Sequence, residues 1–220
     1  MELKHARVRL KLHTLKPGEG EALLLLHALG GEARDWDISA LGWPGPVHGL
    51  DFAGHGHSGR IYGGAYHVSL WAADADSALA ALERAVLVGA GAGAYAALLV
   101  AGARPEQVPA AVLMGGTGLA GGGAEPDWDD LKAFDSRLEC TRASPVRRQL
   151  GQVPEVDRCI EFAEQDFRPP DYTDAFARAA QRVVLMEDGE PRPPWWESLR
   201  TIEGVQQTHG TLASVLQSLG

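Results

Sequence analysis

Short, continuous apolar segments recur along this chain, and they restrict its possible folds more than any other feature of the sequence. They lack the alternation of apolar and polar residues that is typical of a strand with one face in water. Such segments favour strands that are buried on both faces, as in a parallel sheet covered by helices. The segments are residues 22–26, 47–52, 85–88, 108–114 and 182–186.

Segments with helical spacing lie between these apolar runs. Residues 68–84 carry apolar side chains at helical intervals, residues 93–102 predict an alanine-rich helix, and residues 211–219 predict a short helix near the end of the chain. Residues 3–14 alternate between apolar and charged side chains, which predicts one half-exposed strand. Strands that alternate with helices in this way indicate an α/β fold with a mostly parallel sheet covered on both faces.

The stretch from residue 119 to residue 176 breaks this alternation. It begins with a run of glycines and continues with charged segments that are interrupted by prolines. We therefore predict that residues 1–118 and 177–220 form the core, and that residues 119–176 form a helical cap inserted over one end of the sheet.

The overall composition excludes several classes of protein. The formal net charge is −9, so the chain is poorly suited to bind nucleic acid or an anionic membrane surface. A content of 45% hydrophobic and 22% charged residues indicates a folded globular chain rather than a disordered one. We find no secretory signal and no membrane span in the sequence, and two cysteines are too few for a disulfide framework. We therefore predict a cytoplasmic protein.

The segment that follows the run 85–88 carries the most specific motif. It reads GAGAG over residues 89–93 and leads into the alanine-rich helix, and a strand, tight turn and helix of this form resemble the nucleophile elbow of α/β-hydrolases, G-x-S-x-G. Residues 27–31 (HALGG) resemble the oxyanion-hole loop of that family, and residues 51–58 (DFAGHGHS) resemble its D-x-P-G-x-G-x-S turn. His209 precedes the last helix, where the family has its catalytic histidine. Because the matches follow the family's order, the chain resembles an α/β-hydrolase-fold protein.

The sequence departs from the family at the position of the nucleophile. Gly91 stands where the family has serine, and glycine has no atom that can attack a carbonyl carbon. Two other interpretations of this turn are an ordinary tight connection and a dinucleotide-binding loop. The second requires G-x-G-x-x-G after the first strand of a unit and an acidic residue about twenty positions later. This segment lacks that spacing, so a degenerate elbow is the favoured interpretation.

The resemblance also implies roles for other residues. Leu29 and Ala92 would supply the backbone N–H groups of an oxyanion hole, with His27 in the same loop. His209 would be the catalytic base. The acid is ambiguous, because Arg192 occupies the position where the family has an aspartate. The neighbouring acidic candidates are Asp188 and Glu190, together with Glu187.

Two functions remain open at this point. The first is a non-catalytic or residually active homologue that binds a small carbonyl or carboxylate ligand. The alternative is an active esterase-like or thioesterase-like hydrolase that uses His209 and a backbone oxyanion hole. We predict a small-molecule partner and no cofactor, and the sequence does not indicate an oligomeric state. Asp51, His55 and His57 have a spacing that a metal ion could use, but the favoured interpretation is a structural turn without metal.

Overall fold

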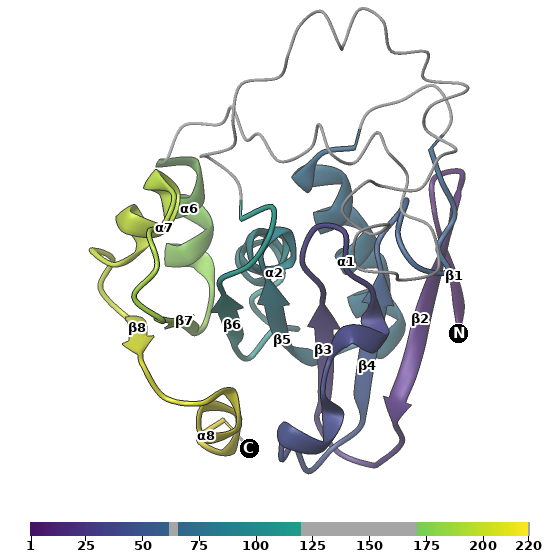
Figure 1. Cartoon of the computed structure of the whole chain (residues 1–220), viewed down its shortest axis with the longest axis horizontal. Helices are drawn as coiled ribbons and strands as arrows, with labels where there is room; N and C mark the ends of the chain where they lie inside the picture. The colour runs from purple at the N-terminus through teal and green to yellow at the C-terminus, as the bar shows by residue number, and fades with distance from the viewer. Residues whose placement is uncertain (62–65, 120–170, 220) are drawn as a thin grey trace, which may run out of the picture.

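The computed structural model describes residues 1–61, 66–119 and 171–219. The described strands form one eight-stranded sheet with the order β1-β2-β4-β3-β5-β6-β7-β8. Strands β1 and β2 are antiparallel to each other, and β2 is antiparallel to β4. Strands β4, β3, β5, β6, β7 and β8 run parallel to one another, and the carboxyl ends of β3, β5 and β6 point upward in Figure 1. The strand bounds are β1 Glu2–His5, β2 Val8–Lys16, β3 Ala22–Leu26, β4 Val47–Asp51, β5 Ala85–Ala90, β6 Ala111–Met114, β7 Val183–Met186 and β8 Val205–Thr208.

Helices cover both faces of this sheet (Figure 1). Helices α1, α2, α6 and α7 pack on one face, and α8 packs on the other beside the two short 3-10 helices η1 and η2. The fold is therefore the α/β fold with a mostly parallel, doubly covered sheet that the sequence predicts. The helix bounds are η1 Ala33–Asp35, η2 Ile38–Ala40, α1 Val68–Leu82, α2 Ala92–Ala103, α6 Asp171–Ala179, α7 Pro194–Leu199 and α8 Leu212–Gln217.

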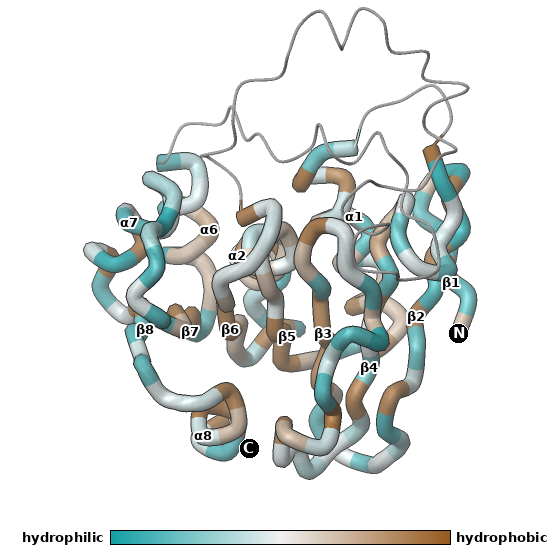
Figure 2. Tube along the Cα trace, in the orientation of Figure 1, coloured by the Kyte–Doolittle hydropathy of each residue, from teal (hydrophilic) through white to brown (hydrophobic). Residues whose placement is uncertain are grey.

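Strand β3 shows why the central segments are apolar without interruption. Leu24 and Leu26 point into the core beneath α1 and α2, whereas Leu23 and Leu25 point into the core on the α8 side. All four side chains are fully buried. A polar residue at any of these positions would lose its hydration, so both faces of the strand select apolar side chains. Figure 2 shows the same hydrophobic band through β3 and β5.

The structure differs from the sequence-based expectation at both edges of the sheet. Residues 3–14 are not one strand but two, β1 and β2, which form a hairpin that turns at Ala6 with a φ of 51°. Strand β8 and helix α7 were not predicted, because β8 is an edge strand whose glutamines are exposed and whose sequence has no apolar run.

The predicted cap lies almost entirely outside the described residues, and so do Cys140 and Cys159. Helix α6 is described, and it crosses the predicted boundary between residues 176 and 177 as it leads into β7. In the part of the chain that the structure describes, no helix is both long and apolar enough to cross a membrane.

Candidate active site

The elbow lies at the carboxyl edge of the sheet, between β5 and α2. Gly91 is buried and has a φ of 55° and a ψ of −122°, a backbone conformation that strains any residue with a side chain. It is the N-cap of α2, and its N–H donates to the carbonyl oxygen of Met114 on β6 at 3.1 Å. The strand, sharp turn and helix predicted from the sequence are therefore present, with glycine at the tip.

A glycine-rich loop over residues 115–118 follows β6 and fills the space in front of this elbow. The carbonyl oxygen of Thr117 accepts two hydrogen bonds, one from the N–H of Leu29 at 3.0 Å and one from the N–H of Ala92 at 3.1 Å. These are the two N–H groups to which the family resemblance assigns the oxyanion hole. The structure thus brings both predicted donors together around one oxygen, and that oxygen belongs to the chain itself.

The 115–118 loop also occupies the place that a side chain at the elbow would need. A Cβ atom at position 91 would lie 2.1 Å from the carbonyl oxygen of Thr117, far inside any permitted contact. The loop can approach so closely because Gly118 has no side chain: its φ is 73°, and a Cβ atom there would lie 2.5 Å from the Cβ atom of Leu29. The elbow and the 115–118 loop can therefore pack this closely only because both Gly91 and Gly118 lack side chains.

His27 connects the backbones of two neighbouring loops. Its ring is buried, and Nε2 accepts a hydrogen bond from the N–H of Phe52 at 3.1 Å while Nδ1 donates to the carbonyl oxygen of Ala28 at 2.8 Å. His55 is used in the same way, since its Nε2 accepts from the N–H of Gly30 at 3.1 Å. Both rings hold the loop after β3 against the loop after β4, and the Nε2 atom of each ring accepts a hydrogen bond from a backbone N–H group.

His209 lies directly after β8 and is exposed. Its Nδ1 lies 3.1 Å from the carbonyl oxygen of Glu187. A carbonyl oxygen only accepts hydrogen bonds, so Nδ1 must carry the proton, and Nε2 of the neutral ring then has the lone pair. Among the described residues no carboxylate forms a hydrogen bond with this ring.

The candidate acids near His209 have other partners. The carboxylate of Glu187 accepts two hydrogen bonds from Arg200, at 2.9 and 2.7 Å, and a third from the indole N–H of Trp196 at 3.1 Å. The hydrogen bond from Arg200 is the main reason that the pKa of Glu187 is lowered. Asp188 accepts from Arg192 at 2.6 Å, which lowers its pKa, and the side chain of Glu190 is exposed. Among the described residues, neither Asp188 nor Glu190 forms a hydrogen bond or ion pair with His209.

Arg192, which replaces the family's acid in the sequence, is a buried cation at this edge of the sheet. Its side chain is only 4% exposed, and its guanidinium stacks over the ring of Trp196 at 5.1 Å. The same group lies against Gly115, where a Cβ atom would lie 2.8 Å from two guanidinium nitrogens. The 115–118 loop therefore begins beside a positive charge.

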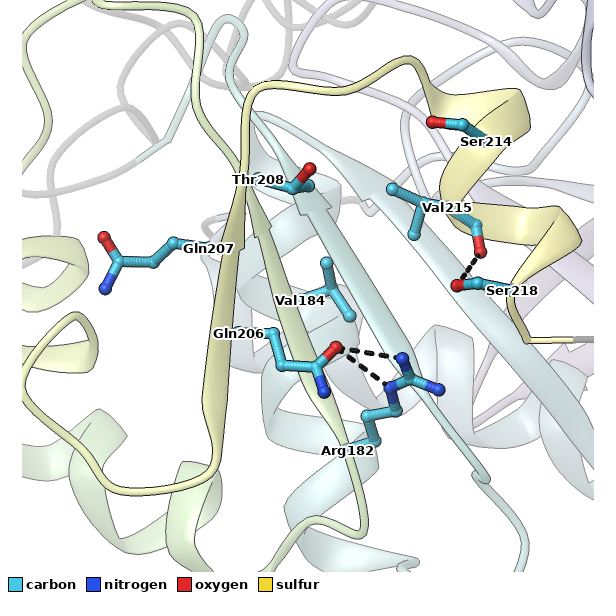
Figure 3. A pocket seen from close by; sticks show the side chains of 8 residues that line it. All are labelled: Arg182, Val184, Gln206, Gln207, Thr208, Ser214, Val215 and Ser218. Carbon is cyan, nitrogen blue, oxygen red and sulfur yellow. Dashed lines mark hydrogen bonds between the residues drawn. The ribbon is translucent and has the colours of Figure 1, made fainter.

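A cavity of about 480 Å³ lies on the α8 side of β7 and β8 (Figure 3). Arg182 crosses it and donates two hydrogen bonds to Gln206. Its described lining contains no histidine and no carboxylate, so it offers no acid–base pair. The other lining residues are Val184, Gln207, Thr208, Ser214, Val215 and Ser218.

The strand order, the elbow and the paired N–H groups together define a protein of the α/β-hydrolase fold. The chain belongs to the alpha/beta hydrolase family, whose model matches residues 23–214. No curated protein matches the sequence.

Several solved structures share the fold over nearly their whole length. A thioesterase domain from the curacin biosynthetic pathway is 16% identical with a TM-score of 0.72, and the match covers 100% of this chain and 97% of that one. A hypothetical protein from Pseudomonas aeruginosa PAO1 is 21% identical with a TM-score of 0.69, covering 100% and 95%. The bottromycin epimerase BotH, in complex with bottromycin A2, is 20% identical with a TM-score of 0.65, covering 100% and 97%. At these identities the similarity establishes the fold.

Reasoning from the sequence missed the group that matters most at this site. The carbonyl oxygen of Thr117 is a backbone atom, and every residue has one, so no residue type marks it. The glycines on both sides of Thr117 are the one available sign, because they indicate a close approach of the backbone to another segment.

Proposed function

We propose that this chain is a member of the α/β hydrolase family that lacks ester hydrolase activity, and that it binds a small molecule through a carbonyl or carboxylate oxygen. The observation that carries the proposal is the position of the carbonyl oxygen of Thr117. It bridges the N–H groups of Leu29 and Ala92 and lies where a side chain at position 91 would have to begin.

The first half of the proposal rests on the chemistry of acyl transfer. A serine hydrolase needs a nucleophile at the elbow and two N–H donors that are free to stabilise the oxyanion. Here the elbow position is Gly91, and both N–H groups already donate to Thr117. Both requirements are therefore unmet in the same place.

The second half rests on what the two N–H groups bind. Distances of 3.0 and 3.1 Å fall within the range of about 2.7–3.1 Å that is expected for donors to an oxyanion. The pair is therefore well shaped for a carbonyl or carboxylate oxygen, and a ligand would take the place of the Thr117 oxygen as the 115–118 loop moves aside. The guanidinium of Arg192, which is paired with Asp188, lies against Gly115 at the start of this loop.

A hydrolytic assay tests the first half. Short-chain aryl esters and thioesters are incubated with the unaltered chain, with Gly91→Ser and with His209→Ala. We expect no turnover above background from any of them. Gly91→Ser should gain nothing: its Cβ atom must displace the 115–118 loop, and no carboxylate among the described residues forms a hydrogen bond with His209 to support it as a base. Turnover by the unaltered chain that His209→Ala abolishes would overturn this half.

A titration followed by NMR tests the second half. Hexanoate is added to ¹⁵N-labelled protein, and the amide resonances of Leu29 and Ala92 are followed. Saturable shifts of these two resonances are expected, with no comparable shift for the matched amide of Gly91, which donates to Met114. If hexanoate leaves both resonances unchanged up to millimolar concentrations, the carboxylate-binding proposal fails.

An active hydrolase is the second candidate, and the environment of His209 favours it. Because Nδ1 donates to the carbonyl oxygen of Glu187, the neutral ring has its lone pair on Nε2, which is the tautomer that a general base needs. It would take a proton from water, and the resulting hydroxide would attack the substrate carbonyl after Thr117 has left the N–H pair. The structural neighbours include a protein named as an epimerase, so the fold alone does not decide between the two candidates.

A further inference from the structure

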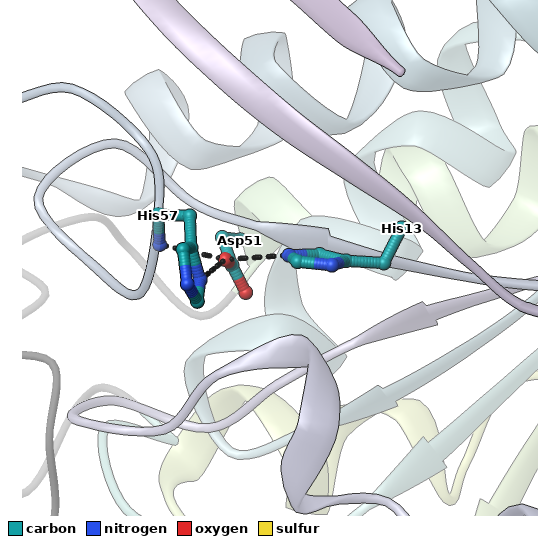
Figure 4. Close-up of side chains that lie close together, drawn as sticks. All are labelled: His13, Asp51 and His57. Carbon is teal, nitrogen blue, oxygen red and sulfur yellow. Dashed lines mark hydrogen bonds and ion pairs between the residues drawn. The ribbon is translucent and has the colours of Figure 1, made fainter.

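A buried carboxylate with two imidazoles beside it lies where β2 pairs with β4 and the chain turns after β4 (Figure 4). Asp51 is 1% exposed, and its Oδ2 lies 2.9 Å from Nε2 of His13 and 3.5 Å from Nδ1 of His57. These three ligand atoms lie within 4.8 Å of one another. None of the three residues takes part in the candidate active site.

The register of β2 against β4 creates this cluster. His13 pairs with Gly49, and Lys11 pairs with Asp51, so His13 and Asp51 are diagonal neighbours on one face of the sheet. Gly49 has no side chain, so nothing on β4 separates the imidazole of His13 from the carboxylate. His57 reaches the same oxygen from the turn that follows β4.

The spacing and chemistry of these groups suit a transition metal. Ligand atoms about 2.0–2.1 Å from a tetrahedral zinc ion lie about 3.3 Å from one another, and the two measured separations of 2.9 and 3.5 Å bracket that value. The second oxygen of Asp51 accepts a hydrogen bond from the N–H of Ala33 at 2.8 Å, which fixes the orientation of the carboxylate as outer-shell partners of metal ligands do. We infer that His13, Asp51 and His57 form a binding site for a divalent transition-metal ion such as Zn²⁺.

Metal binding requires two local adjustments. His13 now donates from Nε2 to Asp51, so on binding its proton must move to Nδ1 or leave to solvent, which exposes the lone pair to the metal. The side chain of His57 is 44% exposed, so its ring can turn to bring Nδ1 closer to the other two ligand atoms. Water can then complete the coordination of the ion. Oδ2 of Asp51 also accepts from the backbone N–H of His57 at 2.8 Å, and this bond holds the turn in place beside the ligands.

The ligand set in the structure is His13, Asp51 and His57, whereas the sequence spacing indicated Asp51, His55 and His57. His55 is not available, because its Nε2 accepts from the N–H of Gly30 and its ring packs against Trp71. His13 takes its place, although it is far from Asp51 in the sequence. A bound ion would connect β2, β4 and the following turn, and would therefore stabilise this side of the fold.

Isothermal titration of the full chain with Zn²⁺ tests the site, with His57→Ala as the test variant and His48→Ala as the matched control. His57 is exposed, so its removal leaves the core intact, and His48 is a half-buried histidine of β4 outside the cluster. We expect one Zn²⁺ per unaltered chain, an affinity at least about tenfold weaker in His57→Ala, and no change in His48→Ala.

Thermal unfolding supplies a second readout that does not depend on the stoichiometry. At a Zn²⁺ concentration about a hundred times the Kd of the unaltered chain, the unfolding midpoint of the unaltered chain should rise by about 5 °C, and that of His57→Ala by at most about half as much. Three results would each overturn the proposal: no saturable binding, binding that His57→Ala leaves unchanged, or an equal loss of affinity in both variants.

Discussion

Replacing Gly91 by alanine tests whether the 115–118 loop really fills the site. The new Cβ atom would lie 2.1 Å from the carbonyl oxygen of Thr117, so the loop must move and give up its hydrogen bonds to Leu29 and Ala92. Two such bonds contribute about 1–3 kcal/mol together. The positive φ of 55° adds backbone strain of about 1–3 kcal/mol. We therefore expect Gly91→Ala to lower the free energy of unfolding by about 2–6 kcal/mol.

Gly204→Ala is the matched control for the strain. Gly204 has a φ of 90°, and no described atom lies within 4 Å of the place that its Cβ would take. Gly204→Ala should therefore lower the free energy of unfolding through backbone strain alone. The difference between the two variants in this free energy then measures the cost of displacing the 115–118 loop. With a urea m-value of about 2 kcal/mol/M, a difference of 2 kcal/mol separates the two unfolding midpoints by about 1 M.

Amide hydrogen exchange gives the same test at individual residues. The N–H groups of Leu29 and Ala92 should be protected in the unaltered chain and should exchange faster in Gly91→Ala. If Gly91→Ala costs no more than Gly204→Ala, and the two amides exchange quickly in the unaltered chain, then the Thr117 oxygen does not occupy the N–H pair. The reasoning behind the proposed function would then be refuted.

Three further variants test other parts of the structure by urea unfolding. Gly118→Ala should cost about 2–4 kcal/mol, because its Cβ would meet that of Leu29 at 2.5 Å; a cost below about 1 kcal/mol would contradict the packing. Glu187→Gln should lower the free energy of unfolding by about 1–3 kcal/mol near pH 7. Hydrogen bonding from Arg200 lowers the pKa of Glu187, so the difference in stability between the unaltered chain and the variant should be present above pH 4.5 and shrink as the pH falls further. Burial raises the pKa of Asp74, so the unaltered chain should lose stability relative to Asp74→Asn as the pH rises above 3.8, and a parallel pH profile would refute this.

Much of the fold could be predicted because burial on both faces leaves a mark on the sequence. The fully buried leucines of β3 and the valines of β5 form uninterrupted apolar runs, and the glycines of the elbow mark a turn that larger residues cannot make. Strand β8 left no such mark, since Gln206 and Gln207 are exposed at the sheet edge and their pairing with β7 depends on backbone hydrogen bonds.

The site divides in the same way. The sequence by itself shows the glycine at the elbow, and its resemblance to the family predicts the two N–H donors and the histidine after the last strand, because the motifs follow the family's order. Three sets of contacts were decided only by the tertiary structure. The carbonyl oxygen of Thr117 accepts from both N–H groups, and the carboxylates of Glu187 and Asp188 accept from Arg200 and Arg192. His13 donates a hydrogen bond to Asp51. These contacts join segments that are distant along the chain, and they depend on strand register and on backbone atoms, which residue types do not encode locally.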